Sequence, residues 1–195
     1  MPFLRAGYRR RVLGLCEQLL QSRGPVKHAL DYGCGDGWFA KQFADKGLAG
    51  DVAAVDVQQP RDALVLVRVY DGGRLPFDNA QFDLVYALDV LHHTPDPLAS
   101  LAEIARCSRS WLLLKDHTFD SCWGWLSLAA MDEIGNRRFG VVSRYRYMRR
   151  FEWLPQIEAE GFELIELIHP AACHTSLLGW ATNRLQFAGL WRRVT

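Results

Sequence analysis

The sequence predicts an α/β protein with a doubly wound, Rossmann-like sheet that is covered by helices on both faces. Apolar runs of strand length alternate with amphipathic runs of helix length over residues 26–115, which is the rhythm of repeated β–α–β units. The continuous apolar run over residues 52–57 is typical of a strand that is buried on both faces of a parallel sheet. A chain of 195 residues can build a sizeable core, and we expect one domain over residues 1–195.

The first helix is expected over residues 5–21, because Val12, Leu15 and Leu19 fall at helical spacing. A strand, a glycine-rich turn and a second helix should follow it. The expected elements up to residue 115 are strands over 26–31, 52–57, 63–70, 82–88 and 110–115, and helices over 38–46 and 98–106.

After residue 115 the strand–helix rhythm breaks and resumes only near residue 152. The segment at about 118–150 is too long for an ordinary connection, and long insertions of this kind are commonly lids over a site. We therefore interpret it as a lid-like insertion. The elements expected here and beyond are helices over 123–133 and 152–160, and strands over 162–168 and 182–191.

Composition excludes several classes of protein. The net charge of +1 gives no global signature of nucleic-acid or membrane binding. Five cysteines without a Cys-x-x-Cys pair argue against a disulfide framework or a zinc site. No apolar core follows the first charges, as a signal peptide would require, and charges interrupt the apolar stretch over residues 111–131. We expect a cytoplasmic protein without a transmembrane segment.

The stretch over residues 29–40 is the most informative part of the chain. Asp31 ends a predicted strand, and glycines follow at positions 33, 35 and 37 before the next helix. Glycines in such a turn adopt backbone angles that a Cβ obstructs, and they let a ligand lie against the main chain. A dinucleotide fingerprint needs a small residue where this chain has Trp38, and a P-loop needs Gly-Lys-Ser/Thr. Both of these interpretations are therefore disfavoured.

Three acids fall at or just past successive predicted strand ends: Asp31, Asp56 and Asp71. In open α/β sheets the ligand crevice lies outside the carboxyl ends of the strands. Asp56 lies 19 residues after Gly37, which suits an acceptor of hydrogen bonds from two ribose hydroxyls. We expect Asp71 to accept from an adenine amino group, and Asp31 to orient the turn and a ligand ammonium.

Taken together, these segments resemble the class I S-adenosyl-L-methionine (SAM)-dependent methyltransferases, in particular the methyltransferase type 11 group. The core is similar to the ubiquinone and menaquinone methyltransferases, over about residues 27–117. The matching segments are Leu30-Asp31-Tyr32-Gly33-Cys34-Gly35-Asp36-Gly37, Ala54-Val55-Asp56, Asp71 with Leu75-Pro76-Phe77 and Phe82-Asp83-Leu84-Val85, and Leu91-His92-His93 before Asp96-Pro97. The region after residue 117 does not match the ubiquinone enzymes, so their substrate is not carried over.

The resemblance implies a seven-stranded sheet in the order 3-2-1-4-5-7-6, with strand 7 antiparallel. It implies SAM as the methyl donor and S-adenosylhomocysteine as the product. The glycine turn would hold the methionine end, Asp56 the ribose, and Asp71 with Gly72 the adenine. The cofactor-binding residues that it implies are Asp31, Gly33, Cys34, Gly35, Gly37, Asp56, Val57, Asp71, Gly72 and Leu88.

Methyl transfer from a sulfonium is an in-line displacement, which mainly needs alignment and exclusion of water. A base is needed only where the acceptor must lose a proton. The candidates are His92, His93, His117 and Asp89, of which His93 and His117 are selected as bases or pocket-lining residues. A plain loop or helix-capping role is the alternative for each histidine. No spaced histidines or carboxylate cluster indicate a metal site, so no metal is expected.

Six arginines occur within residues 137–150, with aromatic residues between them and no acid. Arginine forks match phosphate and carboxylate groups, although a solvated basic face is the alternative. Trp123 belongs to an apolar stretch that could wall a hydrophobic substrate or, with the arginines, touch a membrane surface. The candidate substrate-binding residues are Arg144, Arg146 and Trp123.

The predicted function is SAM-dependent methyl transfer to a small-molecule or lipid-like acceptor. An acidic group on that acceptor would suit the arginines. Two alternatives stay open: an RNA or protein methyltransferase that uses the arginines, and a SAM-binding module without catalysis. Nucleic acid is disfavoured, because the positions after the strand over 82–88 lack the Asn/Asp-Pro-Pro-Tyr/Phe motif of base-amino methyltransferases. The sequence carries no signal for an oligomeric state.

Overall fold

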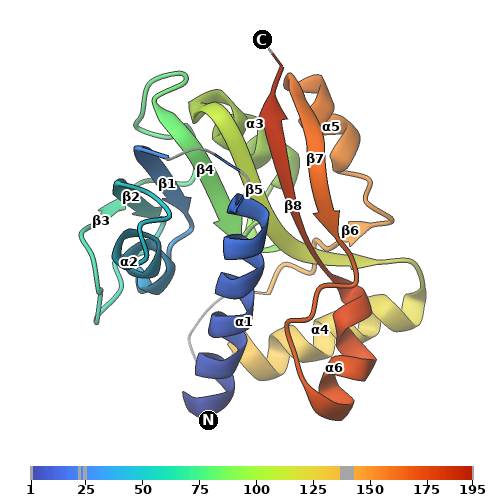
Figure 1. Cartoon of the computed structure of the whole chain (residues 1–195). Coiled ribbons are helices and arrows are strands. Elements are labelled where there is room, and N and C mark those ends of the chain that lie inside the picture. Colours follow the sequence, from blue (N-terminus) through green and yellow to red (C-terminus); the bar gives the residue numbers. More distant parts are fainter. Residues whose placement is uncertain (1, 22, 24–25, 137–142, 195) are drawn as a thin grey trace.

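The computed structural model describes residues 2–21, 23, 26–136 and 143–194, which form a sheet with helices on both faces (Figure 1). The strands are β1 (His28–Tyr32), β2 (Asp51–Asp56), β3 (Val67–Val69), β4 (Phe82–Leu88), β5 (Ser108–Phe119), β6 (Met148–Arg149), β7 (Phe162–Ile168) and β8 (Gln186–Arg193). The helices are α1 (Pro2–Leu20), α2 (Trp38–Asp45), α3 (Pro97–Cys107), α4 (Cys122–Asn136), α5 (Leu154–Ala159) and α6 (Ser176–Thr182), with short 3₁₀ turns η1 (Leu91–His93) and η3 (Asn183–Leu185).

The sheet has the strand order β3-β2-β1-β4-β5-β8-β7. The first five of these strands run parallel, and β8 runs antiparallel to both of its neighbours, β5 and β7. This confirms the predicted fold class and the predicted order 3-2-1-4-5-7-6. The predicted strands 6 and 7 correspond to β7 and β8, because the short strand β6 was not predicted. The two-residue strand β6 is an addition that pairs with the end of β5, where Thr118 lies opposite Met148.

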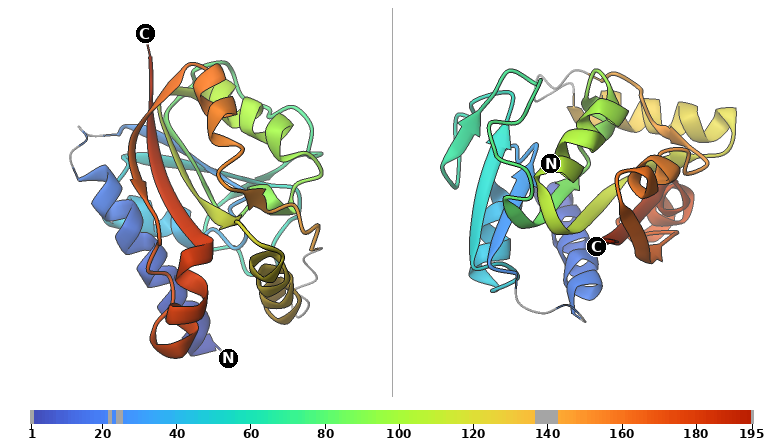
Figure 2. Two further views of the ribbon diagram at one scale, coloured as in Figure 1. Left: turned by 90° about the vertical axis from the view of Figure 1, so that its right-hand side faces the viewer. Right: turned by 90° about the horizontal axis from the view of Figure 1, so that it is seen from above.

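Each face of the sheet is covered by its own pair of helices (Figure 2). Leu30 and Tyr32 of β1 belong to the core cluster that includes residues of α3 and α5. Ala29 belongs to the cluster that includes residues of α1 and α2. Because side chains alternate along a strand, consecutive residues of β1 pack into the core clusters on opposite faces of the sheet.

Three predicted boundaries differ from the structure by four residues each. The strand expected over 63–70 is confined to β3 (Val67–Val69), and Leu66 before it is 95% exposed. The strand expected over 110–115 extends to Phe119, because β8 pairs with it as far as His117. The strand expected from residue 182 begins at Gln186, because residues 176–185 are helical. There the Asn183 amide bonds both the N–H and the C=O of His174.

Helices α4 and α6 lie at the end of the molecule where β4 and β5 end (Figure 1). Leu128 of α4 packs with Tyr147 and Leu185 in a small core cluster of its own. The segment that the sequence marks as an insertion is therefore packed against the carboxyl end of the sheet. None of the helices in the described part of the chain has both the length and the apolar character needed to cross a membrane.

Candidate cofactor and catalytic site

The glycine turn follows β1 and has the backbone geometry that the sequence predicts for it. Gly33, Gly35 and Gly37 all have positive φ, at 70°, 54° and 74°. The N–H of Gly33 donates to the carbonyl of Val55 at 2.9 Å, which ties the turn to β2. A Cβ on Gly33 would come within 2.3 Å of a methyl group of Val90. Residues with a Cβ are therefore excluded at this position by both conformation and space.

Asp56, at the carboxyl end of β2, is linked directly to the glycine turn. Its Oδ2 accepts from the N–H of Gly35 at 2.8 Å, and its Oδ1 accepts from the N–H of Gln58 at 3.1 Å. Asp71 lies beyond β3, is exposed, and accepts from the N–H of Gly73 at 2.9 Å. The acids expected to contact a nucleoside therefore lie at the carboxyl ends of neighbouring strands, as the topology requires.

The remaining residues expected in this site have different degrees of exposure. Val57, directly after Asp56, is 52% exposed, and Gly72 has a φ of 86°. Leu88 ends β4 and is buried, as is Cys34 within the turn. The residues expected in this site therefore include both buried and exposed side chains.

Helix α1 is fixed to the glycine turn by a contact that the sequence analysis missed. Arg9 makes two parallel hydrogen bonds of 2.9 Å to the two carboxylate oxygens of Asp36, and its guanidinium lies 5.6 Å from the centre of the Trp38 ring. Bidentate pairs of this kind fix geometry as well as adding energy. The clue in the sequence was Asp36 within the turn, but nothing local identified its partner 27 residues earlier.

Asp31, at the end of β1, is buried, and its Oδ2 has no hydrogen-bond partner within the part of the chain that the structure describes. Burial raises the pKa of this carboxyl to about 8, against smaller opposing contributions from the Tyr86 hydroxyl and the Ala40 amide. A buried carboxyl with spare acceptor capacity beside a glycine turn is a fitting partner for a cationic group.

The raised pKa of Asp31 predicts a specific dependence of stability on pH. The folded chain holds this proton up to a pH of about 8, whereas the unfolded chain loses it near pH 4. Between these limits the folded state binds more protons, so this group lowers stability as pH rises, by at most about 1.4 kcal/mol per pH unit. Urea unfolding at several pH values should show a flatter profile for Asp31→Asn than for wild type. Parallel profiles would contradict the prediction.

A second buried network joins α1 to β4, β5 and β8. The Tyr8 hydroxyl donates to Asp89 Oδ2 at 2.6 Å, and the Lys115 ammonium contacts Tyr8, Asp89 and Gln186. Lys115 is completely buried. Burial lowers the pKa of Lys115, but the charge of Asp89 outweighs it and keeps that pKa above its ordinary value. The two groups therefore form an ion pair in which the lysine is buried and the aspartate is partly exposed.

The histidines predicted as catalytic candidates are brought together around Asp116. The N–H of Leu91 and Nδ1 of His92 lie 3.0 and 2.5 Å from the two oxygens of Asp116, and the N–H of His117 donates to it at 2.7 Å. The ring centre of His92 lies 3.9 Å from that of His93 and 4.7 Å from that of His117. His117 lies inside β5, so the alternative of a loop or helix-capping histidine is wrong for it.

The electrostatics of this cluster favour an ionised Asp116. Burial acts to raise the pKa of Asp116, but the charge of His92 and hydrogen bonds from His117 and His92 bring it well below its usual range. Burial lowers the pKa of His92, and Asp116 outweighs that effect and raises it. Burial, followed by the charge of His92, lowers the pKa of His93 to about 4. Burial and then the charge of Lys115 lower the pKa of His117.

The insertion contributes to the same cluster. The Tyr147 hydroxyl donates to Asp132 Oδ2 at 2.6 Å, and that oxygen lies 3.8 Å from Nε2 of His92. Trp123 is 78% exposed on α4, and Arg144 and Arg146 are exposed beyond it. The structure therefore does not bring these three predicted substrate-binding residues into the buried cluster. Three residues of the expected basic and aromatic stretch, Arg137, Arg138 and Phe139, lie outside the described residues.

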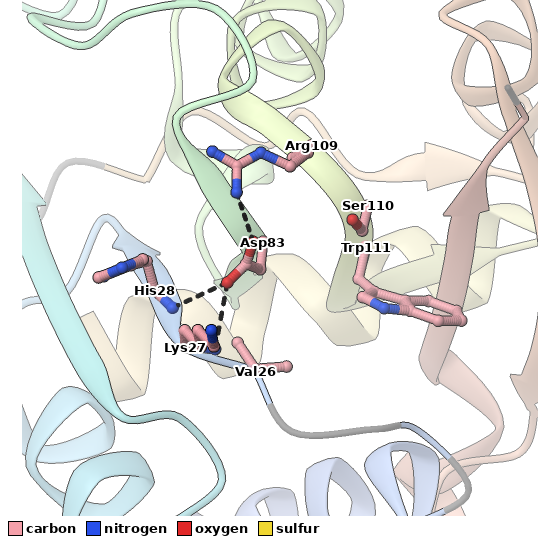
Figure 3. A pocket seen from close by; sticks show the side chains of 7 residues that line it. All are labelled: Val26, Lys27, His28, Asp83, Arg109, Ser110 and Trp111. Atoms are coloured by element: carbon pink, nitrogen blue, oxygen red, sulfur yellow. Dashed lines mark hydrogen bonds and ion pairs between the residues drawn. The ribbon is translucent and has the colours of Figure 1, made fainter.

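A depression of about 510 Å³ lies at the amino ends of β1, β4 and β5, at the opposite end of these strands from the glycine turn (Figure 3). Its central acid, Asp83, accepts from the N–H groups of Lys27 and His28 at 3.1 Å and from Arg109 at 2.9 Å. These residues stand at the amino ends of the strands, whereas ligands of open α/β sheets bind at the carboxyl ends. We therefore assign no cofactor to this depression. Its lining consists of Val26, Lys27, His28, Asp83, Arg109, Ser110 and Trp111.

The strand order, the glycine turn and the acids at the strand ends define the class I methyltransferase fold. Residues 30–111 match the family model of the methyltransferase domain, which confirms the resemblance for this part of the chain. The family and fold imply SAM as the cofactor. The residues present fit it, because the space where a Cβ of Gly35 would stand is open and a buried oxygen of Asp31 has no hydrogen-bond partner among the described residues.

The chain is similar to curated and solved methyltransferases. It is 28% identical over 157 residues to a sarcosine/dimethylglycine N-methyltransferase from Halorhodospira halochloris, covering 72% of this chain and 56% of that protein. It is 27% identical over 101 residues to a ubiquinone biosynthesis O-methyltransferase from Thiobacillus denitrificans, covering 45% and 43%. A SAM-dependent methyltransferase structure from Mesorhizobium loti superposes with a TM-score of 0.63 at 15% identity, covering 87% and 92%. The chain spans between about a third and just over half of the length of the curated relatives it matches.

Proposed function

We propose that this chain is a SAM-dependent methyltransferase that acts on a small-molecule or lipid-like acceptor. The observation that carries the proposal is the hydrogen bond from the Gly35 N–H to Asp56, which joins the glycine turn to the acid at the next strand end. This arrangement would place a glycine-rich backbone and a carboxylate beside one ligand at the carboxyl ends of the strands. We further propose one domain over residues 1–195, with the insertion at about 118–150 as its lid.

The proposed division of the site follows its geometry. Gly33, Cys34, Gly35 and Gly37 would cradle the methionine end of SAM, with Asp31 beside the ammonium. Asp56 and Val57 would hold the ribose, Asp71 and Gly72 the adenine, and Leu88 would form part of the floor. Two carboxylates at neighbouring strand ends suit the hydroxyls and the amino group of a nucleoside, which are hydrogen-bond donors.

When bound, SAM supplies a methyl group that is already activated for transfer. The chain then has to hold the acceptor in line and to exclude water. The insertion helix α4 and the exposed arginines beyond it would cover the acceptor. His117, whose pKa is lowered by burial and by Lys115, is a neutral imidazole that could accept a proton from the acceptor.

Calorimetric titration tests the cofactor assignment. We expect SAM and S-adenosylhomocysteine to bind the full chain at one site. Release of S-adenosylhomocysteine in the presence of an acceptor then separates an enzyme from a SAM-binding module. Absence of binding by both compounds would contradict the proposal, and binding without turnover on any acceptor would favour the non-catalytic alternative.

The acceptor panel follows from charge and from the relatives. Arg144 and Arg146 suit an anionic group, and sarcosine and dimethylglycine, which the H. halochloris relative is named for, are small carboxylates. The first panel should therefore hold these two compounds, phosphate esters and long-chain acids with a methylatable group.

Charge reversal tests the role of the arginines. With an acceptor from this panel, Arg144→Glu/Arg146→Glu should lower kcat/KM by about tenfold or more, because hydrogen bonds to charged groups contribute about 1.5–3 kcal/mol. The affinity for S-adenosylhomocysteine should stay unchanged. Arg10→Glu/Arg11→Glu on α1 gives the same change of charge as a control. Unaltered kinetics in the first variant would make the arginines a solvated face.

A further inference from the structure

A cluster of nitrogen and oxygen ligand atoms lies where η1 meets α4. His92 and His93 of η1 and Asp132 of α4 place one ligand atom each within 4.8 Å of one another. His92 is 1% exposed and Asp132 is 8% exposed, so the cluster is not a group of solvated surface acids. Two imidazoles and one carboxylate form a donor set that is typical of divalent transition-metal ions.

The spacing of the donors suits an ion between them. Nε2 of His92 and Oδ2 of Asp132 face each other at 3.8 Å, which is too long for a hydrogen bond. Two metal–ligand bonds of about 2.0–2.2 Å each span a donor separation of up to roughly 4 Å. The ring of His93 lies beside that of His92, with the ring centres 3.9 Å apart. The separation of His92 and Asp132 therefore suits a shared ion, and His93 is close enough to be a third ligand.

The groups behind these donors hold them in the orientation that a metal site requires. Nδ1 of His92 is 2.5 Å from Asp116, so that Nε2 is the nitrogen directed toward Asp132. Asp116 in turn accepts from the backbone N–H groups of Leu91 and His117, which makes it an orienting partner rather than a ligand. The Tyr147 hydroxyl fixes Asp132 at 2.6 Å. A histidine ligand backed by a carboxylate, and a carboxylate ligand backed by a hydroxyl, are the usual outer contacts of metal sites.

The charges of the surrounding groups also favour a cation. Asp89, Asp116 and Asp132 bring three carboxyl groups to this region, and the Lys115 ammonium contacts Asp89. Buried negative charge is costly without compensation. A divalent ion between His92 and Asp132 would add positive charge beside these carboxyl groups.

We propose that His92, His93 and Asp132 bind a divalent first-row transition-metal ion, with Zn²⁺ the representative case. The ion would join η1, which directly follows the strand at the cofactor edge, to the helix of the insertion. Three protein ligands would leave a coordination position for water or for an acceptor atom. The proposal does not depend on the methyltransferase proposal, because its donors are distinct from the residues assigned to SAM.

Binding of Co²⁺, a spectroscopic substitute for Zn²⁺, tests the site. Tag-free, chelator-treated full-length chain should bind one Co²⁺ with the visible absorption of a low-coordinate site, and Zn²⁺ should displace it. His93→Gln and Asp132→Asn should each weaken Co²⁺ binding by about 100-fold or more, and Tyr147→Phe by about 10-fold through its orienting contact. His28→Gln, at the opposite edge of the sheet, is the matched control.

A second readout separates this site from the cofactor site. Zn²⁺ should raise the Tm of wild type but not that of Asp132→Asn, because binding to the folded state alone is stabilising. Titration with S-adenosylhomocysteine reports independently on the cofactor site in the same variants. Wild type without stoichiometric Co²⁺, or with Co²⁺ bound equally well by His93→Gln, Asp132→Asn and Tyr147→Phe, would overturn the proposal. His92 would then be a histidine held between Asp116 and Asp132 without an ion.

Discussion

Replacement of Lys115 by methionine is expected to lower the free energy of unfolding by about 3 kcal/mol, because it leaves the partly buried Asp89 without its cation. Lys115 is completely buried and contacts Asp89, Tyr8 and Gln186, so three polar groups lose a partner at once. Urea unfolding monitored by circular dichroism measures the loss. The Tm should fall by roughly 10 °C in a chain of this size.

A matched control and a double variant make this expectation specific. Lys41→Met removes an exposed lysine whose pair with Asp45 lies on one helix, and it should change stability by less than about 0.5 kcal/mol. Lys115→Met/Asp89→Asn should be more stable than Lys115→Met, since the unpaired charge is gone. Asn also tolerates the positive φ of 59° at this position. A loss in Lys115→Met no larger than in Lys41→Met would contradict the ion pair.

Replacement of Asp56 by alanine is expected to weaken S-adenosylhomocysteine binding by about 10- to 100-fold, since hydrogen bonds to a charged group contribute about 1.5–3 kcal/mol. Two effects combine here. The carboxylate is the proposed partner of the ribose hydroxyls, and it also holds the N–H of Gly35 at 2.8 Å, so its loss loosens the turn as well. Calorimetric titration of the two proteins under one buffer condition measures the change.

Asp51→Ala is the control, because Asp51 is the exposed first residue of the same strand and stands at its amino end. It should leave the affinity unchanged. Asp56→Asn separates the two effects, because its amide oxygen can still accept from Gly35 while the charge is lost. Wild-type affinity in Asp56→Ala would show that the cofactor lies elsewhere.

The parts of the fold that were predictable from sequence are those with local signals. The glycine turn, the strand over 82–88 and the helix that Pro97 opens each carry their own turn or periodicity signal, and they occur where expected. The end of β5 was not predictable, because it is set by antiparallel pairing with β8, about 70 residues later. The extra strand β6 depends on the same long-range pairing.

The buried networks were only half predictable. His92, His93 and His117 could be selected because they lie near the expected ends of strands 4 and 5. Asp132 and Tyr147 belong to a segment without a recognisable pattern, and their proximity to His92 comes from the packing of α4. Lys115 reads as the last residue of an apolar strand, and its burial becomes intelligible only with Asp89 and Tyr8 beside it.

Tyr8 and Arg9 are consecutive residues of α1, yet they reach two different parts of the molecule. Arg9 holds Asp36 in the glycine turn, and Tyr8 holds Asp89 beyond the end of β4. One helical turn therefore holds the loop after β1 and the loop after β4 at a fixed separation. A chain lacking this helix would lose both contacts together, and the two loops would no longer be connected through α1.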